Sequence, residues 1–141
     1  MKQPEELVFF IDRALGRKII AERLRADGAR VEIHDDHFPV DCTDALWLSE
    51  VGMRGWVVLT KDRNFQRREV EIVAIAHSGA RVFQLTAAGI QGSEMAEIFA
   101  RALRKMTRIS MSNRAPFIAR VTRRGSVYLV FTHRKLQRYG K

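Results

Sequence analysis

An α/β fold with a largely parallel central sheet and a C-terminal β-hairpin is the fold class that this sequence predicts. Through residues 7–85, short apolar runs alternate with longer stretches of helical periodicity. Such a β-α-β-α-β-α-β order is typical of a parallel sheet with right-handed helical crossovers. Further along, two alternating stretches flank Arg123-Arg124-Gly125, which is typical of two strands joined by a short turn.

The elements of the parallel part follow in chain order. Four short, mostly apolar runs are expected to be strands; they are residues 7–11, 30–33, 56–59 and 80–85. Helical spacing of apolar residues predicts the three helices between them; they are residues 15–27, 44–53 and 66–77. Gly28 is expected to end the first helix, and Thr43 to cap the second at its N-terminus. Residues 34–41 are predicted to form an irregular polar loop.

The last third of the chain is predicted to be a long helix followed by the hairpin. The helix covers residues 93–111, with Ser93 as its N-cap. The strands of the hairpin are residues 117–122 and 126–132, and the basic residues 133–141 are expected to fray. We expect residues 1–141 to be one domain, with an α/β core at 1–90 and a basic helix-and-hairpin extension at 91–141.

Charge is divided unevenly along the chain. Residues 98–141 hold 12 of the 25 Lys and Arg residues and none of the 16 acids. A tract of this kind favours a polyanionic partner, above all nucleic acid, although it could instead be a solvated basic face or pair with an acidic protein. The candidate contacts to a nucleic-acid backbone are Lys61, Arg63, Arg101, Arg104, Arg108, Arg120, Arg123 and Arg124.

Composition also indicates where in the cell the protein is expected. No run reaches the roughly 18 apolar residues of a membrane span, so no membrane partner is expected. The first residues lack the apolar stretch of a signal peptide, and the single Cys42 cannot form an internal disulfide. These observations predict a cytoplasmic protein.

Three aspartates are placed at the ends of predicted elements. Asp12 follows the first strand, Asp62 follows the third, and Asp44 opens the helix between them. Because parallel strands bring their carboxyl ends to one edge, where α/β sheets bind ligands, we expect these side chains to converge. Converging carboxylates repel one another unless a cation joins them. The sequence therefore predicts a site for Mg²⁺ or Mn²⁺, ions that prefer oxygen ligands and support phosphodiester hydrolysis by an activated water.

Each of these aspartates also has a structural interpretation. Asp12 could cap the turn into the first helix, and Asp62 could form surface ion pairs. Asp44 opposes the helix dipole whatever the function of the protein. The three placements taken together favour the functional interpretation over the structural one.

The loop after the second strand leaves alternatives open. Asp35, Asp36 or Asp41 could supply a metal ligand in place of Asp44 or beside it. The run His34-Asp35-Asp36-His37 could by itself hold a transition metal such as Zn²⁺. Thr60, just before the end of the third strand, could support the carboxylates through its hydroxyl.

Three stretches of the chain resemble the PIN-like nuclease family, in particular its short VapC-type toxins. They are Phe10-Ile11-Asp12, Cys42-Thr43-Asp44-Ala45-Leu46-Trp47-Leu48 and Val57-Val58-Leu59-Thr60-Lys61-Asp62-Arg63-Asn64-Phe65. The resemblance covers residues 7 to about 85 and implies a three-layer α/β/α fold. It implies a metal-dependent endoribonuclease that is the toxin of a type II toxin–antitoxin pair, with Asp12, Asp44 and Asp62 as metal ligands, RNA as substrate and a cognate antitoxin as partner.

The chain departs from that family pattern at one position. Relatives often carry a second acid two residues after the third aspartate, where this sequence has Asn64. An amide oxygen can coordinate a metal but brings no charge, so a catalytically weakened PIN-like nucleic-acid-binding module is the alternative function. The expected assembly is a homodimer or a heteromeric toxin–antitoxin complex.

Overall fold

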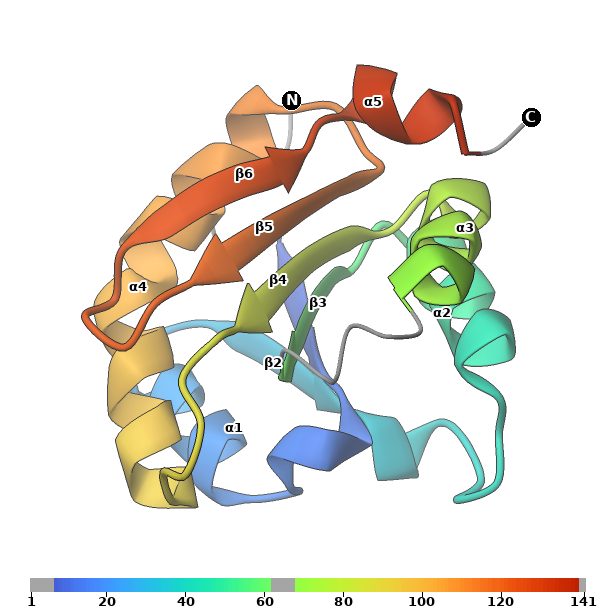
Figure 1. The fold of residues 1–141 in the computed structure, drawn as a ribbon. Coiled ribbons are helices and arrows are strands. Elements are labelled where there is room, and N and C mark those ends of the chain that lie inside the picture. The colour runs from blue at the N-terminus through green and yellow to red at the C-terminus, as the bar shows by residue number, and fades with distance from the viewer. Residues whose placement is uncertain (1–6, 62–67, 140–141) are drawn as a thin grey trace.

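A computed structural model describes residues 7–61 and 68–139, except for the side chains of residues 68–71. Within these residues, one six-stranded sheet has the order β2-β1-β3-β4-β5-β6 (Figure 1). The strands are β1 (Val8–Ile11), β2 (Arg30–Ile33), β3 (Val57–Lys61), β4 (Arg81–Leu85), β5 (Phe117–Val121) and β6 (Val127–Phe131). The first five strands run parallel, and β6 pairs antiparallel with β5. The predicted fold class, a largely parallel α/β sheet with a C-terminal hairpin, is confirmed.

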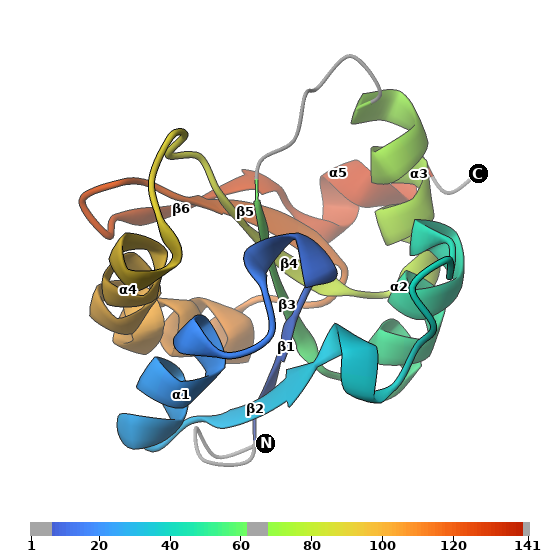
Figure 2. The same cartoon turned by 90° about the horizontal axis from the view of Figure 1, so that it is seen from below.

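Helices cover both faces of this sheet, so the fold has three layers. On one face lie α1 (Ile19–Ala26) and α4 (Gly92–Ser112); on the other lie α2 (Asp44–Met53), α3 (Arg68–Ser78) and α5 (His133–Gln137). Figure 2 shows the two helical layers on either side of the strands. Two short 3-10 helices follow the first two strands: η2 (Arg13–Leu15) begins after Asp12 at the end of β1, and η3 (His34–Asp36) follows β2 directly.

The central strands form because their side chains are apolar on both faces. Successive residues of a strand point to opposite sides of the sheet. In β1, Phe9 and Ile11 therefore enter the core beneath α1 and α4, whereas Phe10 enters the core beneath α2 and α3. Burial on both sides makes β1 and its neighbour β3 a firm base for the residues that follow their carboxyl ends.

Strand order places a topological switch point between β1 and β3. The chain moves outward from β1 to β2 and then crosses to β3 on the other side of β1. Open α/β sheets bind ligands at such a point, outside the carboxyl ends of the strands. Ile11 lies opposite Leu59 in the register, and the Asp12 amide donates to the Leu59 carbonyl at 3.0 Å. Asp12 thus lies at the switch point, beside Thr60.

Two predicted helix starts were wrong. The helix expected from residue 15 begins only at Ile19, because η2 intervenes and Gly16 adopts a φ of 89° that ends it. The long helix begins at Gly92, with Gln91 rather than Ser93 in the N-cap position. The predicted cap on α2 is confirmed, since the Thr43 side chain accepts a hydrogen bond from the Leu46 amide.

The expectation that residues 133–141 fray was wrong for His133–Gln137, which form α5. Thr132 caps this helix by accepting from the Lys135 amide, and Leu136 is 0% exposed. One apolar anchor in the core therefore outweighs the basic composition of the segment. No helix in the described part of the chain is long and apolar enough to cross a membrane.

Candidate active site

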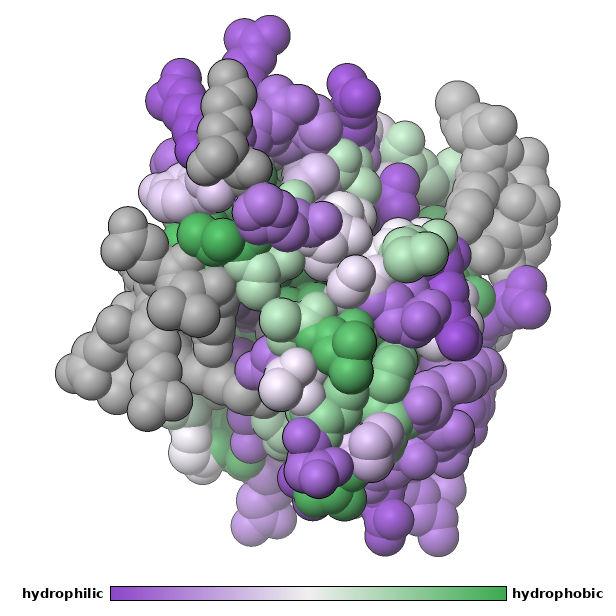
Figure 3. Space-filling view, turned by 90° about the vertical axis from the view of Figure 1, so that its right-hand side faces the viewer, coloured by the Kyte–Doolittle hydropathy of each residue, from purple (hydrophilic) through white to green (hydrophobic). Residues whose placement is uncertain are grey.

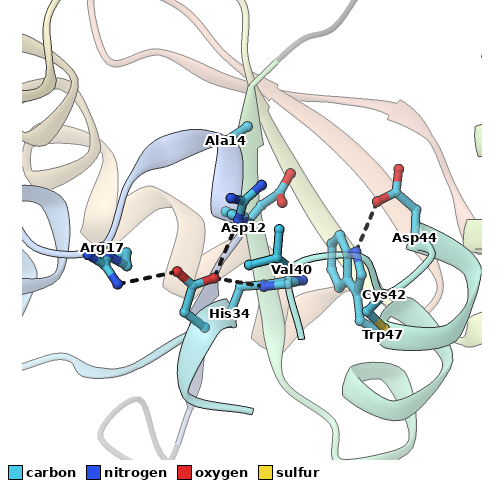
Figure 4. A pocket seen from close by; sticks show the side chains of 10 residues that line it. Asp12, Ala14, Arg17, His34, Val40, Cys42, Asp44 and Trp47 are labelled. Atoms are coloured by element: carbon cyan, nitrogen blue, oxygen red, sulfur yellow. Dashed lines mark hydrogen bonds and ion pairs between the residues drawn. The ribbon is translucent and has the colours of Figure 1, made fainter. Parts of the chain in front are cut away.

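A pocket of about 730 Å³ lies at the carboxyl edge of the sheet, beside the switch point (Figure 4). Its walls come from the segments after β1 and β2 and from the start of α2. The lining residues are Asp12, Arg13, Ala14, Arg17, His34, Asp35, Val40, Cys42, Asp44 and Trp47. The volume is in the range of pockets that take small organic ligands or parts of larger ones.

Asp12 is the most buried acid of the pocket, with 3% of its surface exposed. The Thr60 hydroxyl, on the neighbouring strand β3, donates a 2.6 Å hydrogen bond to Asp12 Oδ2. The contact predicted for Thr60 is therefore present. Burying a carboxylate costs free energy unless polar groups or cations compensate it. The hydrogen bond from Thr60 supplies part of this compensation for Asp12.

Asp44 reaches the same pocket from the first turn of α2. The Trp47 indole nitrogen donates to Asp44 Oδ1 at 3.0 Å, and Trp47 itself is 4% exposed and packs on Phe10, with ring centroids 5.3 Å apart. The core thus fixes the position of this carboxylate through one aromatic side chain. Asp12 and Asp44, 32 positions apart in the sequence, line one pocket, as Figure 4 shows.

The third predicted metal ligand, Asp62, lies outside the described residues, as do Arg63 and Asn64. Within the described ranges, no group of three or more His, Cys, Asp or Glu side chains is placed to hold a metal. Asp12 and Asp44 offer carboxylate oxygens, which suit Mg²⁺ or Mn²⁺. A complete ligand set depends on the segment that follows β3, so the metal-ligand roles stay predictions.

The acids of the loop after β2 separate into two groups. Asp35 lines the pocket, whereas Asp36 and Asp41 are exposed and do not line it. Their assignment as additional ligands stays a prediction without support from the pocket geometry. Asp44 and Asp35 are the acids of this region that face the pocket.

The two histidines of the same loop contact different acids. His34 Nδ1 is 3.3 Å from Asp35 Oδ1, and His37 Nε2 is 2.6 Å from Glu32 Oε1. His34 is 2% exposed and packs against Phe38. This arrangement favours a structural role for His34 over the shared transition-metal site that the sequence left open.

Two arginines on the pocket wall, Arg13 and Arg17, were not among the site residues that the sequence predicted. Arg13 Nε lies 3.6 Å from Asp35 Oδ1, and Arg17 Nη1 lies 3.7 Å from Asp35 Oδ2. A signal was present for Arg13, which directly follows Asp12, but Arg17 lay within the helix expected over residues 15–27 and gave none. Trp47 was also missed as a partner of Asp44, although a spacing of three residues places both on one helix face.

The predicted nucleic-acid contacts are spread over the molecule. Those on α4 are exposed and lie in the layer on the other side of the sheet from α2; they are Arg101, Arg104 and Arg108. Half-buried Lys61 ends β3 at the pocket edge, and half-buried Arg120 lies on β5.

Arg123 and Arg124 lie at the exposed turn that follows β5, on the same sheet edge as the pocket. Three strand spacings separate β1 from β5, which is about 14 Å. Arg123 donates to the Ala88 carbonyl at 3.2 Å and pairs with Glu94 at 3.5 Å, which ties the turn to the segment before α4 and to the first turn of α4.

Comparison with known protein families identifies the class of protein to which this fold and pocket belong. Residues 7–87, more than half of the chain, match the family model described as PIN like domain. The chain belongs to the PIN-like domain family. It is similar to the protein named "Putative ribonuclease VapC45" of Mycobacterium tuberculosis (strain ATCC 25618 / H37Rv), with 29% identity over 111 residues that cover 76% of this chain and 78% of that protein. No solved structure matches the chain.

Proposed function

We propose that this protein is a metal-dependent endoribonuclease that hydrolyses RNA phosphodiester bonds at the pocket beside β1. One observation carries the proposal: Asp12 and Asp44, from separate elements, line one pocket at the switch point of a PIN-like sheet. Similarity to a protein named as a ribonuclease supports the type of substrate.

In this proposal Asp12, Asp44 and Asp62 hold Mg²⁺ or Mn²⁺, and the amide of Asn64 supplements them. When bound, the metal supplies Lewis-acid activation of water and stabilises negative charge on the phosphate. Thr60 orients Asp12, and Trp47 orients Asp44. Such outer-shell contacts hold the ligand oxygens in one arrangement.

The basic residues would bind the RNA backbone on either side of the cut. Lys61 and the hairpin turn lie on the same sheet edge as the pocket, so one strand could contact both. The arginines of α4 would extend the contact to a structured RNA that wraps over the other helical layer. Because these are phosphate contacts, binding should weaken steeply with salt.

We also propose that the protein is the toxin of a type II toxin–antitoxin pair. Exposed apolar side chains support a protein partner, since Leu46 and Met53 lie seven positions apart on α2 and Val40 lines the pocket. Figure 3 shows apolar groups among polar ones on the side of the molecule that carries α2 and α3. An antitoxin that covered this side would block the pocket. Purification from the native cell should then yield a complex with a small companion, whereas an active lone protein would contradict this part.

Incubation of the purified protein with structured RNAs and Mn²⁺ tests the proposed chemistry. We expect cleavage that EDTA abolishes and that Asp12→Asn with Asp44→Asn lowers by more than about 100-fold, beyond the usual loss of an outer-shell partner. Asp27→Asn is the matched control, because Asp27 is exposed and pairs with Arg23 on α1.

Two other outcomes have distinct meanings. Cleavage that persists in EDTA, or in the double variant, would rule out the metal mechanism. Salt-sensitive RNA binding without cleavage in any divalent metal would favour the weakened binding module that Asn64 suggests.

A further inference from the structure

Arg13 and Arg17 form a pair of cationic side chains on the pocket wall to which the proposed chemistry gives no role. Arg13 belongs to η2, directly after Asp12, and Arg17 follows Gly16 in the turn to α1. Gly16 adopts a φ of 89°, which other residues rarely adopt, and so turns the chain between the two arginines. Their side chains are 50% and 74% exposed, and both line the pocket.

Asp35 holds the two guanidinium groups without using up their hydrogen-bond donors. The closest distances, 3.6 Å from Arg13 and 3.7 Å from Arg17, are ion pairs but too long for hydrogen bonds. A guanidinium group has five N–H donors, so each arginine keeps donors for a ligand. The three side chains together carry a net charge of +1.

Arg23, only six positions further along, shows what a structural arginine looks like in this protein. It donates to Asp27 at 2.6 Å and to Glu97 at 2.9 Å, which ties α1 to α4. Within residues 7–61 and 68–139, Arg13 and Arg17 make no side-chain hydrogen bond of this kind. The contrast indicates that the N–H donors of Arg13 and Arg17 are available to a ligand in the pocket.

The acid that holds the pair is itself fixed to the core. His34 lies 3.3 Å from Asp35, and the His34 ring is buried between Phe38 and Trp47, with ring centroids 5.5 and 5.8 Å away. Asp35 is therefore an anion fixed to the core, and its two ion pairs draw both guanidinium groups toward the same part of the pocket wall.

Charge is separated across this pocket. Arg17 lies at one end and Asp44 at the other, with Asp12 between them in the view of Figure 4. A ligand that suits both ends of the pocket has a negatively charged group for the arginines. Next to that group it has the bond on which Asp12 and Asp44 act. A phosphodiester chain has this property, because each phosphate is followed by another, and arginine binds phosphate oxygens in a bidentate manner.

We infer that Arg13 and Arg17 form a phosphate-binding subsite, which holds an RNA phosphate next to the scissile one and sets the strand against Asp12 and Asp44. The inference rests on the proposed RNA substrate and deepens it. Asp35 is the placeholder anion that keeps both guanidinium groups in position before RNA binds.

Binding of a fluorescein-labelled single-stranded poly(U) oligonucleotide in EDTA tests the subsite without cleavage. The slope of log K against log salt concentration changes by about 0.7 for each phosphate contact to a single strand. Because the subsite holds one phosphate, Arg13→Ala with Arg17→Ala should lower the slope by about 0.7. Arg13→Lys with Arg17→Lys should restore most of the slope, because the charges return, while affinity stays below that of the wild type.

The matched control is Arg30→Ala with Arg114→Ala, which removes the same charge from exposed positions. Arg30 opens β2 at the amino edge of the sheet, away from the pocket. Arg114 precedes β5, also at the amino edge of the sheet. This control should leave the slope at the wild-type value. Thermal unfolding of each variant checks that the fold is intact.

An unchanged slope in the Arg13/Arg17 alanine variant, or an equal change in the control, would overturn the subsite. Absence of poly(U) binding by the wild type would overturn it as well. Loss of a companion protein with unchanged RNA binding would overturn it and assign the pair to a protein interface. If the slope falls as expected but Mn²⁺ produces no cleavage, the subsite stands and the proposed chemistry fails.

Discussion

At the scale of single residues, Thr60 is the contact through which the sheet orients Asp12. The register of β1 and β3 places the two side by side, so the hydroxyl meets the carboxylate without any rearrangement. Asp12 then has one oxygen whose direction is set by a hydrogen bond from a neighbouring strand. A metal site benefits from such a contact because the ligand does not have to be ordered upon binding.

Replacement of Thr60 by Val should remove this contact at nearly constant volume. We expect Mn²⁺ affinity and RNA cleavage to fall by about 10-fold to 100-fold, the usual cost of losing an outer-shell partner. Titration calorimetry with Mn²⁺ and a cleavage assay measure the two quantities. Thr60→Ser keeps the hydroxyl and should stay near the wild type. Equal metal affinity in the Val and Ser variants would show that the hydrogen bond has no part in the site.

At the scale of elements, the close approach of α2 and α3 determines where Asp44 lies. A Cβ atom on Gly52 of α2 would collide with the backbone carbonyl oxygen of Ser78, at the end of α3. Backbone cannot move aside as a flexible side chain does. Gly52 therefore allows α2 to pack deeply, and the N-terminus of the same helix carries Asp44 to the pocket.

Gly52→Ala should push the two helices apart. We expect a loss of about 1–3 kcal/mol in the free energy of unfolding, as for other overpacked sites, measured by urea denaturation. Ser49→Ala, at an exposed position of the same helix, is the control and should stay within about 0.5 kcal/mol of the wild type. A Gly52→Ala protein as stable as this control would contradict the packing that we describe.

The elements differ in how far the sequence predicts them. The strands were placed within one or two residues because they are apolar or alternating runs between polar turns, and the start of α2 was placed because Thr43 marks it. The turn at Gly16 was missed, since helical periodicity continues through it. The helix α5 was missed because its anchors, Leu136 in the core and the hydrogen bond from His133 to the Ala115 carbonyl, depend on contacts with distant parts of the chain.

The candidate site also contains residues whose arrangement the sequence predicts and residues whose arrangement it does not. Asp12 and Asp44 could be predicted to meet because parallel strands bring their carboxyl ends, and the starts of the helices that follow them, to one edge of the sheet. The arrangement of Arg13 and Arg17 about Asp35 depends on side-chain distances, which no spacing in the sequence gives. The position of Asp62 is still predicted only from the parallel direction of the strands.

At the scale of the whole molecule, the C-terminal third completes the sheet rather than standing apart. β5 pairs with β4, and α4 buries Phe99, Ala102 and Met106 in the core that it shares with α1. We propose that residues 1–90 and 91–141 act as one domain. The basic tract is then held in a fixed position relative to the pocket, as an RNA-binding surface requires.

The central claim is that Asp12 and Asp44 hold a divalent metal at the carboxyl edge of the sheet, and a crystal soaked in Mn²⁺ tests it most directly. Anomalous scattering should show Mn²⁺ in the pocket, bound by carboxylate oxygens of both residues, and the signal should disappear in Asp12→Asn crystals. Mn²⁺ found only elsewhere, for example at His37 and Glu32, or absent from the pocket under conditions that support RNA cleavage, would contradict the account.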